Sequence, residues 1–324
     1  MNLEKNHILK SSRIRVGLTI GDPSGIGPAI TVKAVSKLGG IADFIIIGDR
    51  FVLNKINNFS RILRKGVKII DLKNVEQGSF KFGKINGNYG RASIEYLDYA
   101  LRLLKENKID CLVTCPISKE AINKAGFKYS GHTEYFINKT KTKDVVMMLL
   151  NRKLKFSLIT RHLPIRDVSG ELSVSRILDV TRITYQSLKS IFKVSLPRIA
   201  ICGLNPHASD NGLIGNEEEK VIKPAVKRLN KIFKGIDGPF PSDLAIYKAL
   251  KGDYDAVIAM YHDQALIPLK ITGMDSGVNI SLGLPFVRTS PLHGTAFDIA
   301  DKDKLANPDS LASAIKLAIK CTLG

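Results

Sequence analysis

Short, continuous apolar runs recur along the chain and predict β-strands that are buried on both faces. Nine of them lie at residues 14–20, 44–48, 67–72, 111–115, 145–150, 156–160, 198–202, 256–260 and 278–281. Between these runs, apolar residues return every three or four positions, which is the period of an amphipathic helix. Helices are expected at residues 92–107, 173–192 and 217–233, with shorter ones at 134–138 and 244–250. This alternation predicts an α/β fold with a mostly parallel sheet.

Three histidines share a position relative to the predicted strands. His162, His207 and His262 each follow the carboxyl end of a strand, where a parallel sheet gathers its ligand sites. Imidazoles bind divalent metals such as zinc and cobalt, and three protein ligands leave room for a substrate. The ordinary alternative for each is a histidine that satisfies a local hydrogen bond. Their spacing matches no local metal motif, so both interpretations stay open at this point.

Polar residues in two other places suggest that an anion binds. His132 and Thr133 come directly before a predicted helix, and the free N–H groups at a helix start attract anions. An ordinary Thr133 N-cap is the alternative. Lys270, Asn279 and Arg288 could pair with a carboxylate or phosphate, or could be unremarkable surface residues.

A glycine-rich loop at residues 21–28, with the sequence GDPSGIGP, follows the first predicted strand. It is not the G-x-G-x-x-G fingerprint of a Rossmann fold, and Pro23 and Pro28 remove two N–H donors. A tight turn near the cleft is the interpretation that we favour.

Charge and composition narrow the function. The 324 residues carry a net charge of +19, and a chain of this length commonly forms two lobes. Nucleic-acid binding is one explanation of the charge, but lysines and arginines are spread along the whole chain without a basic tract. No apolar stretch reaches the roughly 20 residues that span a membrane. The polar start of the chain is unlike a secretion signal, so a cytoplasmic location is expected, with no membrane or nucleic-acid partner.

Taken together, the motifs resemble the 4-hydroxythreonine-4-phosphate dehydrogenase family. The resemblance runs through GDPSGIGP, GHTEYF, RHLPIRDV, CGLNPHASDNGLIGNEE, YHDQALIPLK and NISLGLPFVRTSPLHGTAFDIA. It implies two α/β/α lobes around a central cleft, as in isopropylmalate dehydrogenase and unlike a Rossmann fold. The lobes would comprise residues 1–130 with 285–324 on the cofactor side, and residues 131–284 for metal, substrate and dimerisation.

The same resemblance assigns residues to the site. A divalent metal (Zn, Mg or Co) is expected on His162, His207 and His262. The expected substrate-binding residues are His132, Thr133, Lys270, Asn279 and Arg288. Family members usually carry an acidic residue after GIGP, where this chain has Ala29.

A second resemblance concerns the cofactor. The segment that begins at His293-Gly294 and reaches Asn307 is similar to the adenosine-binding loop of isopropylmalate and isocitrate dehydrogenases. Asp298 falls where NAD-using members carry a carboxylate, which binds the ribose 2′-hydroxyl and repels a 2′-phosphate. NAD is therefore the expected cofactor, with a simple turn role for Asp298 as the alternative.

The implied reaction is the NAD-dependent oxidation of 4-phosphooxy-L-threonine to a β-keto acid. This acid decarboxylates to 3-amino-2-oxopropyl phosphate in vitamin B6 biosynthesis. A homodimer with the site at its interface is expected. Asp243 is a candidate for the general base, with a helix N-cap as the alternative. Oxidation of another phosphorylated hydroxy acid, such as phosphoerythronate, is the nearest rival, and a basic nucleic-acid-binding protein is a rival from another class.

Overall fold

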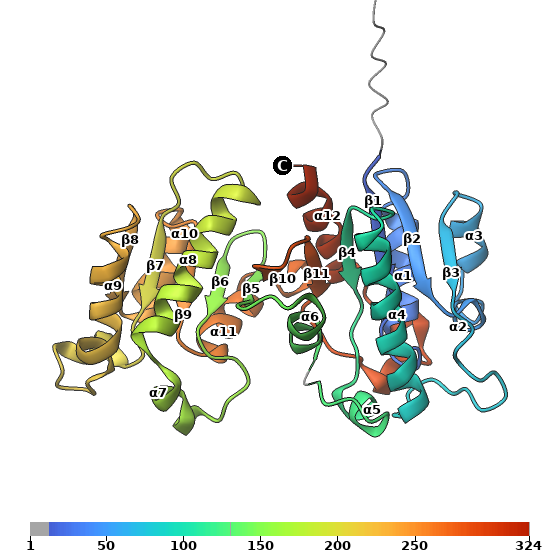
Figure 1. The fold of residues 1–324 in the computed structure, drawn as a ribbon, viewed down its shortest axis with the longest axis horizontal. Helices are drawn as coiled ribbons and strands as arrows, with labels where there is room; N and C mark the ends of the chain where they lie inside the picture. The colour runs from blue at the N-terminus through green and yellow to red at the C-terminus, as the bar shows by residue number, and fades with distance from the viewer. Residues whose placement is uncertain (1–12, 130, 324) are drawn as a thin grey trace, which may run out of the picture.

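In the computed structural model, which describes residues 13–129 and 131–323, one mixed sheet runs through the whole molecule (Figure 1). Its eleven strands have the order β3-β2-β1-β4-β11-β10-β5-β6-β9-β7-β8. The strands are β1 (Arg15–Thr19), β2 (Asp43–Gly48), β3 (Lys68–Asp71), β4 (Cys111–Thr114), β5 (Val146–Leu150), β6 (Lys155–Leu158), β7 (Ile199–Cys202), β8 (Ile236–Phe240), β9 (Ala256–Ala259), β10 (Val278–Leu282) and β11 (Arg288–Pro291).

Helices cover both faces of this sheet (Figure 1). In the half built from β1–β4 and β11, α4 packs on one face, while α1 and α12 pack together on the other. In the other half, α8 and α9 cover one face, and α10 and α11 cover the opposite one. The α-helices are α1 (Gly27–Lys37), α2 (Arg50–Leu53), α3 (Phe59–Leu63), α4 (Gly87–Lys105), α5 (Lys119–Lys124), α6 (His132–Thr140), α7 (Val168–Glu171), α8 (Val174–Ser190), α9 (Lys223–Leu229), α10 (Ser242–Lys251), α11 (His262–Gly273) and α12 (Asp309–Leu323).

The centre of the sheet departs from the parallel arrangement. Strand β10 runs antiparallel to β11 and β5, and β5 runs antiparallel to β6, whereas the other seven pairings of the described strands are parallel. In this register Asn279 on β10 lies opposite Ser290 on β11, and Arg288 on β11 pairs with Leu112 on β4. The reversed strand β10 therefore brings Asn279 next to β11, the strand that carries Arg288 and Ser290.

The expected α/β class is confirmed, and all nine predicted strands are present. Strands β8 and β11 were not predicted, because β8 contains Gly238 and Pro239 and β11 reads Arg-Thr-Ser-Pro, neither of which is an apolar run. Helix α4 starts earlier than expected because the Asn86 side chain caps it. Since one sheet joins both halves, the boundaries of the two expected lobes stay a prediction.

The expected helix at residues 217–233 is interrupted. It begins as a π-helical turn, η3 (Glu218–Ile222), and continues as α9 only to Leu229. The carboxylates of Glu217 and Glu218 accept hydrogen bonds from Asn205, so these two side chains hold a neighbouring loop. A π-turn of this kind is often found at functional sites.

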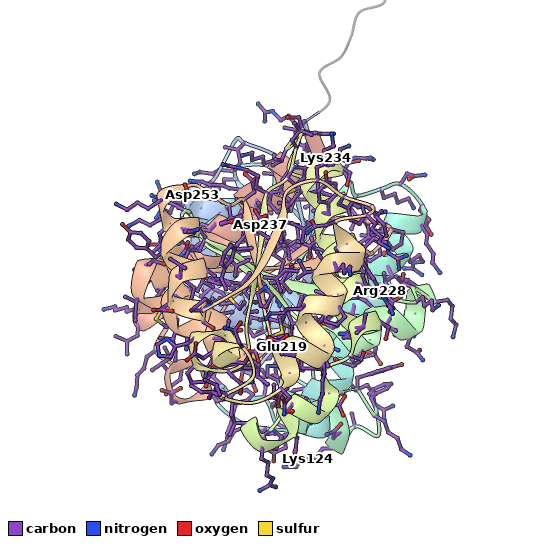
Figure 2. The ribbon with its side chains drawn as sticks, turned by 90° about the vertical axis from the view of Figure 1, so that its left-hand side faces the viewer. Lys124, Glu219, Arg228, Lys234, Asp237 and Asp253 are labelled. Carbon is purple, nitrogen blue, oxygen red and sulfur yellow. The ribbon has the colours of Figure 1, made fainter. Side chains whose placement is uncertain are left out.

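Charges of both signs are intermingled on the end of the molecule formed by β8, α9 and α10 (Figure 2). On this end Figure 2 labels the basic residues Arg228 and Lys234 and the acidic residues Glu219, Asp237 and Asp253, whereas the labelled Lys124 belongs to α5. In the described part of the chain, no helix is long and apolar enough to span a membrane. The polar stretch at residues 1–12, which weighed against a secretion signal, lies outside the described residues.

The glycine-rich loop after β1 is a tight, buried turn, as expected, and Asp22 lies at its centre. Asp22 is fully buried, and its Oδ1 accepts hydrogen bonds from the backbone N and the Oγ of Ser24, each at 3.0 Å. The backbone N of Asp22 donates to Pro116 O, and the N of Ile26 donates to Thr295 O. The loop thereby joins the end of β4 to the segment that contains the expected cofactor residues.

We predict a pH-dependent stabilisation by Asp22→Asn. Burial raises the pKa of Asp22 from 3.8 to about 6, so the folded protein keeps a proton that the unfolded chain releases between these values. Stability due to this group is therefore present at pH 4 and falls as the pH rises towards 6. Relative to wild type, the variant should gain on the order of 2 kcal/mol of unfolding free energy between pH 4 and pH 7. Urea unfolding of wild type and variant at pH 4 and at pH 7 measures this gain. Asp253→Asn, at an exposed position, is the control, and a difference that does not change with pH contradicts the assignment.

Candidate active site

A cavity of about 220 Å³ lies where the centre of the sheet meets the start of α6. It is lined by residues from the end of β4, the start of α6, β5, β10, β11 and the loops after β6 and β11. The lining includes four of the five expected substrate-binding residues, namely His132, Thr133, Asn279 and Arg288. It also includes His162, His293 and Gly294.

Arg288 is the dominant charge of this cavity. Its side chain is 1% exposed, and it forms no ion pair with the described residues. Its Nε and Nη2 donate to Thr114 Oγ1 at 3.1 and 2.5 Å, and Nη1 donates to Ser281 Oγ at 3.2 Å. Burial lowers the pKa of the guanidinium to about 9, which still leaves it charged at neutral pH. The guanidinium also lies over the Phe136 ring, with its carbon 5.6 Å from the ring centroid. A buried cation with only hydroxyl groups and an aromatic face around it is costly, and an anionic ligand would compensate for it.

Three further polar atoms in the cavity residues are buried without a hydrogen-bond partner in the described structure. They are His132 Nε2, Asn279 Oδ1 and His293 Nε2. Burial lowers the pKa of His132 well below its usual value, and the charge of Arg288 lowers it further, so this imidazole is neutral. Because buried polar groups are almost always hydrogen-bonded, these atoms mark positions that a polar ligand would occupy.

The start of α6 supplies His132 and Thr133. The N-cap is Gly131, and Thr133 lies within the first turn, where it is 5% exposed. The alternative that Thr133 is a simple N-cap is therefore wrong. The first turn of α6 and Arg288 line the same cavity, and the positive end of a helix favours an anion there.

Two of the three expected metal ligands lie side by side. His162 follows β6 and His262 begins α11 directly after β9, and the parallel pairing of these strands brings the two imidazole rings to 5.3 Å between centroids. Partial burial lowers the pKa of His162, as do the nearby His262 and Arg161, which keeps the imidazole in its neutral, metal-binding form. His262 Nδ1 contacts Asp263 Oδ1 at 2.6 Å.

His207 lies on a neighbouring loop, exposed to solvent. Within the described residues, no three His, Cys, Asp or Glu side chains come together as a ready metal site. The backbone of residues 207–211 is left-handed throughout, with φ values of 54°, 52°, 69°, 46° and 56°. None of these residues is glycine, and left-handed geometry costs an L-residue roughly 1–2 kcal/mol. Strain of this kind persists at functional sites when the surroundings hold it.

A buried amide ties the His207 loop to His262. Gln264, in the first turn of α11, donates from Nε2 to Gly203 O at 2.8 Å and to Ser242 Oγ at 2.7 Å. Its Oε1 accepts from the backbone N of Met260 at 2.6 Å. One side chain therefore fixes the ends of β7 and β9 and the start of α10 relative to one another.

Lys270 and Asp243 do not line the cavity of their own chain. Lys270 is exposed on α11, beside the exposed Ile267 and Ile271. Asp243 is exposed in the first turn of α10, where the N-cap position belongs to Pro241, so the alternative that Asp243 is an N-cap is wrong. Either residue would need a neighbouring molecule or a movement of the chain to reach the cavity.

The expected cofactor residues fall into two groups. His293 and Gly294 line the cavity, and His293 Nδ1 contacts Gly294 O at 3.0 Å. Asp298 is exposed in a short 3₁₀ turn, Phe297–Ile299. Asn307 uses its side chain within the chain, because Oδ1 accepts from the Asp309 N that begins α12 and Nδ2 donates to Asp275.

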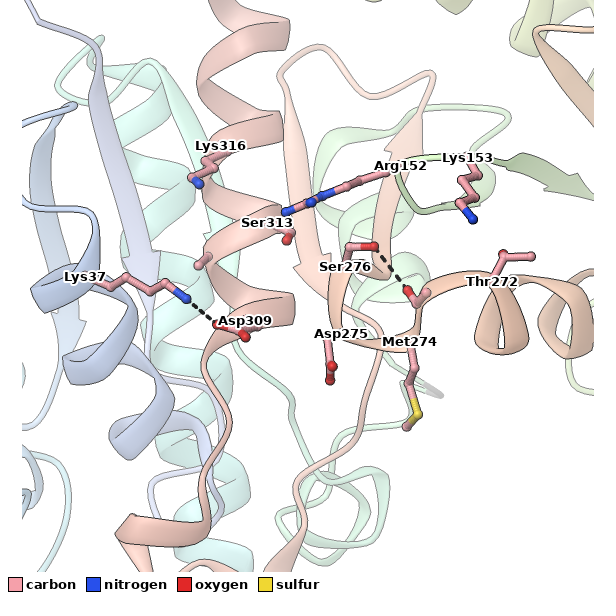
Figure 3. Close-up of a pocket in the computed structure, with 12 residues that line it drawn as sticks. Lys37, Arg152, Lys153, Thr272, Met274, Asp275, Ser276, Asp309, Ser313 and Lys316 are labelled. Atoms are coloured by element: carbon pink, nitrogen blue, oxygen red, sulfur yellow. Dashed lines mark hydrogen bonds and ion pairs between the residues drawn. The ribbon is translucent and has the colours of Figure 1, made fainter. Parts of the chain in front are cut away.

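A second cavity, of about 410 Å³, lies between α12, the turn after β5 and the end of α11 (Figure 3). It contains more basic than acidic side chains, namely Lys37, Arg152, Lys153 and Lys316 against Asp275 and Asp309. None of the expected site residues lines it, and Lys37 is already paired with Asp309 at 2.7 Å. The candidate site is therefore the cavity around Arg288.

Several supporting residues were not expected from the sequence. Thr114 and Ser281 hold the Arg288 guanidinium, and the role of Thr114 depends on the pairing of β11 with β4, which is far away in the chain. Gln264 stands two residues after His262 within YHDQ, and that adjacency was the only signal for it.

The buried arginine, the neutral imidazoles and the unpaired polar atoms define an α/β enzyme site for a small anionic substrate. Residues 31–318 match the family model described as Pyridoxal phosphate biosynthetic protein PdxA, and the chain belongs to this family of dehydrogenases.

Its relatives carry two names. The chain is 41% identical over 322 residues to a 4-hydroxythreonine-4-phosphate dehydrogenase from Sulfurihydrogenibium sp., covering 94% of this chain and 98% of the relative. It is 38% identical over 324 residues to a D-threonate 4-phosphate dehydrogenase from Salmonella typhimurium, covering 94% and 98%. Among solved structures, a 4-hydroxythreonine-4-phosphate dehydrogenase from Klebsiella pneumoniae aligns with a TM-score of 0.83 and 34% identity, covering 96% of this chain and all (100%) of that one. The resemblance drawn from the motifs is thus confirmed.

We predict that Arg288→Met weakens substrate binding without lowering the stability of the protein. The change removes a buried charge that has no carboxylate partner, so the variant should unfold at the same temperature as wild type or higher. The increase in unfolding temperature that a phosphorylated substrate gives wild type should disappear, because a charged hydrogen-bond donor worth roughly 2–3 kcal/mol is lost. Thermal unfolding with and without substrate measures both effects. A variant that substrate still stabilises as strongly as wild type contradicts the role of Arg288.

We also predict that Gln264→Ala lowers the unfolding free energy by roughly 2–4 kcal/mol, because Met260 N and Gly203 O lose buried hydrogen bonds. Urea unfolding measures the loss. Lys231→Ala, at an exposed position, serves as the control and should change stability by less than about 0.5 kcal/mol. A loss as small as that of the control would show that Gln264 does not hold the ends of β7 and β9 and the start of α10 together.

Proposed function

We propose that this protein is a metal-dependent dehydrogenase that uses NAD to oxidise 4-phosphooxy-L-threonine, in the biosynthesis of pyridoxal phosphate. The substrate loses a hydride to NAD and a hydroxyl proton to a base. The resulting β-keto acid loses carbon dioxide to give 3-amino-2-oxopropyl phosphate. The single observation that carries this proposal is the buried Arg288, which has no carboxylate partner among the described residues and lies beside the free polar atoms of His132 and Asn279.

The residues of the cavity would bind and orient this substrate. Arg288 offers a planar guanidinium to a phosphate or carboxylate, and the first turn of α6 adds backbone donors. Asn279 and His132 complete the polar lining, and holding both ends of a small substrate fixes the reacting carbon. Thr114 and Ser281 keep the guanidinium in place through their hydroxyl groups.

The donor chemistry fits a divalent metal. His162 and His262 are adjacent, and Gln264 ties the loop that carries His207 to the start of α11. Zinc, cobalt or magnesium held by these three residues would supply Lewis acidity at the substrate hydroxyl. Since the described chain brings only two of the three imidazoles together, a second copy of the chain would complete the ligand set.

The NAD assignment rests on residues 293–307. His293 and Gly294 line the cavity, which would place the nicotinamide beside the substrate, and the exposed Asp298 is free to accept a bond from a ribose hydroxyl. The glycine-rich loop supports this segment through the bond from Ile26 N to Thr295 O at 2.8 Å.

A homodimer would explain why Lys270 and His207 lie outside their own cavity. The outer face of α11 and the turn after it exposes Ile267 by 58%, Ile271 by 81% and Met274 by 59%. These residues recur at four- and three-residue spacing and form one apolar stripe next to Lys270. An exposed stripe of this kind marks an interaction site, and we assign it to a second copy. In such a dimer Lys270 would reach the site of the partner subunit.

The second candidate substrate is D-threonate 4-phosphate, because relatives of 34–38% identity carry that name. The two substrates share the phosphate, the carboxylate and the hydroxyl group that is oxidised. They differ in having an amino or a hydroxyl group beside the carboxylate. The contacts around Arg288 suit both substrates, so the choice between them depends on turnover.

The proposed reaction can be tested by measuring activity. NADH formation at 340 nm is expected with 4-phosphooxy-L-threonine, NAD and a divalent metal, and the rate should fall by at least about a hundredfold in His207→Ala. Lys231→Ala, at an exposed position, is the control variant, and D-threonate 4-phosphate is tested as a second substrate. Faster turnover of D-threonate 4-phosphate would move the assignment to that substrate, and no turnover of either would contradict the proposal.

The proposed dimer can be tested by measuring the oligomeric state. Wild type should sediment as a dimer, and Ile271→Asp should sediment as a monomer, because it places a charge in the proposed apolar interface. Ile232→Asp is the matched control, since Ile232 is 68% exposed in the turn after α9. Analytical ultracentrifugation measures both. A dimer that survives Ile271→Asp but not Ile232→Asp would place the interface elsewhere.

A further inference from the structure

The strained loop that carries His207 is held by a buried carboxylate. Glu218, in the π-turn η3, has no exposed surface and forms no ion pair with the described residues. Its Oε1 accepts from the backbone N of Leu204 and of Asn205, each at 2.8 Å. Its Oε2 accepts from Asn205 Nδ2, also at 2.8 Å. Three N–H donors thus compensate the buried charge and fix the two residues that precede Pro206 and His207.

The neighbouring glycines leave just enough room for this contact. A Cβ atom on Gly203 would lie 2.9 Å from Glu218 Oε1 and 3.0 Å from Ala208 Cα. A Cβ atom on Gly215 would lie 2.5 Å from Asn205 Nδ2, and the φ of Gly215 is +83°. The two glycines let the chain close tightly around the carboxylate of Glu218, which explains their positions in CGLNPHASDNGLIGNEE.

Other bonds close the loop on itself. Glu217 Oε2 accepts from Asn205 Nδ2 at 2.8 Å, and Glu217 Oε1 accepts from Ser169 Oγ. Ser209 is fully buried, and its carbonyl accepts from Gly212 N and Ile214 N, each at 3.0 Å. The left-handed residues 207–211 are therefore enclosed between a fixed entry at Asn205 and a fixed exit near Ile214.

We propose that Glu218 is the positioning residue for His207: its buried carboxylate holds the loop entry, and thereby keeps residues 207–211 left-handed with the imidazole presented to solvent. The assignment to metal binding rests on the function proposed for this site. Holding the loop in advance removes the ordering cost that metal binding would otherwise carry. Glu218 touches neither substrate nor metal, and it acts through Asn205 and the backbone.

The test combines two measurements on full-length wild type, Glu218→Ala, Glu218→Gln and Glu219→Ala. Hydrogen–deuterium exchange of the metal-free proteins follows residues 203–216, with residues 256–260 as an internal reference. Visible absorption during titration with Co²⁺ reports metal affinity and ligand geometry. Glu219→Ala is the matched control, because Glu219 is on the same turn but pairs with Lys223 at the surface.

Glu218→Ala should exchange at least about tenfold faster in residues 203–216 and bind Co²⁺ about 10–100-fold more weakly, with an altered spectrum. In Glu218→Gln, the exchange rate and the Co²⁺ affinity should lie between those of Glu218→Ala and wild type. The amide oxygen can still accept from the backbone N–H groups of Leu204 and Asn205, but the amide nitrogen cannot accept from Asn205 Nδ2. Glu219→Ala should match wild type in both measurements. If Glu218→Ala does not fold, Glu218→Gln decides by the same criteria.

Two results would overturn the proposal: wild-type exchange in residues 203–216 of Glu218→Ala, or faster exchange with unchanged Co²⁺ affinity and spectrum. If wild type itself binds no Co²⁺, the metal function proposed for the site fails. The exchange data then decide separately whether Glu218 holds the loop.

Discussion

The burial of Arg288 is the constraint on which the site depends. A guanidinium that is removed from water and bonded only to Thr114 and Ser281 is unfavourable unless an anion joins it. The reversed strand β10 makes this burial possible, because it places Ser281 and Asn279 beside β11 at the centre of the sheet. The fold thus buries a cationic group before any anion binds, and this site would favour the phosphorylated acid proposed as the substrate.

The half of the molecule that contains β6, β7 and β9 carries the three histidines proposed to bind a metal. Parallel strands β6, β9 and β7 end at one edge, and their loops carry His162, His262 and His207. Gln264 joins two of these loops, while Glu218 supports the strained one. Rigid supports of this kind would hold the proposed metal ligands in place before a metal binds, which lowers the ordering cost of binding. The anion site and the imidazoles meet where His162 reaches the cavity of Arg288.

Local sequence patterns predicted most of the fold, because buried parallel strands are apolar throughout. Strand β11 could not be found in this way, since its Arg288 is buried by tertiary packing and would ordinarily be a surface residue. In the site, chemistry and motif resemblance pointed to His132, Thr133 and Asn279. The supports Thr114, Gln264 and Glu218 depend on contacts between distant segments, which no local pattern encodes. Lys270 was assigned to the substrate, yet it is exposed on α11, a position that the proposed dimer would explain.

The most direct test of this account is a crystal structure with 4-phosphooxy-L-threonine bound. The account predicts a phosphate or carboxylate oxygen within about 3 Å of the Arg288 guanidinium, with His132 and Asn279 also bonded to the substrate. A substrate bound with both anionic groups away from Arg288, whose guanidinium still donates hydrogen bonds only to Thr114 and Ser281, would contradict it.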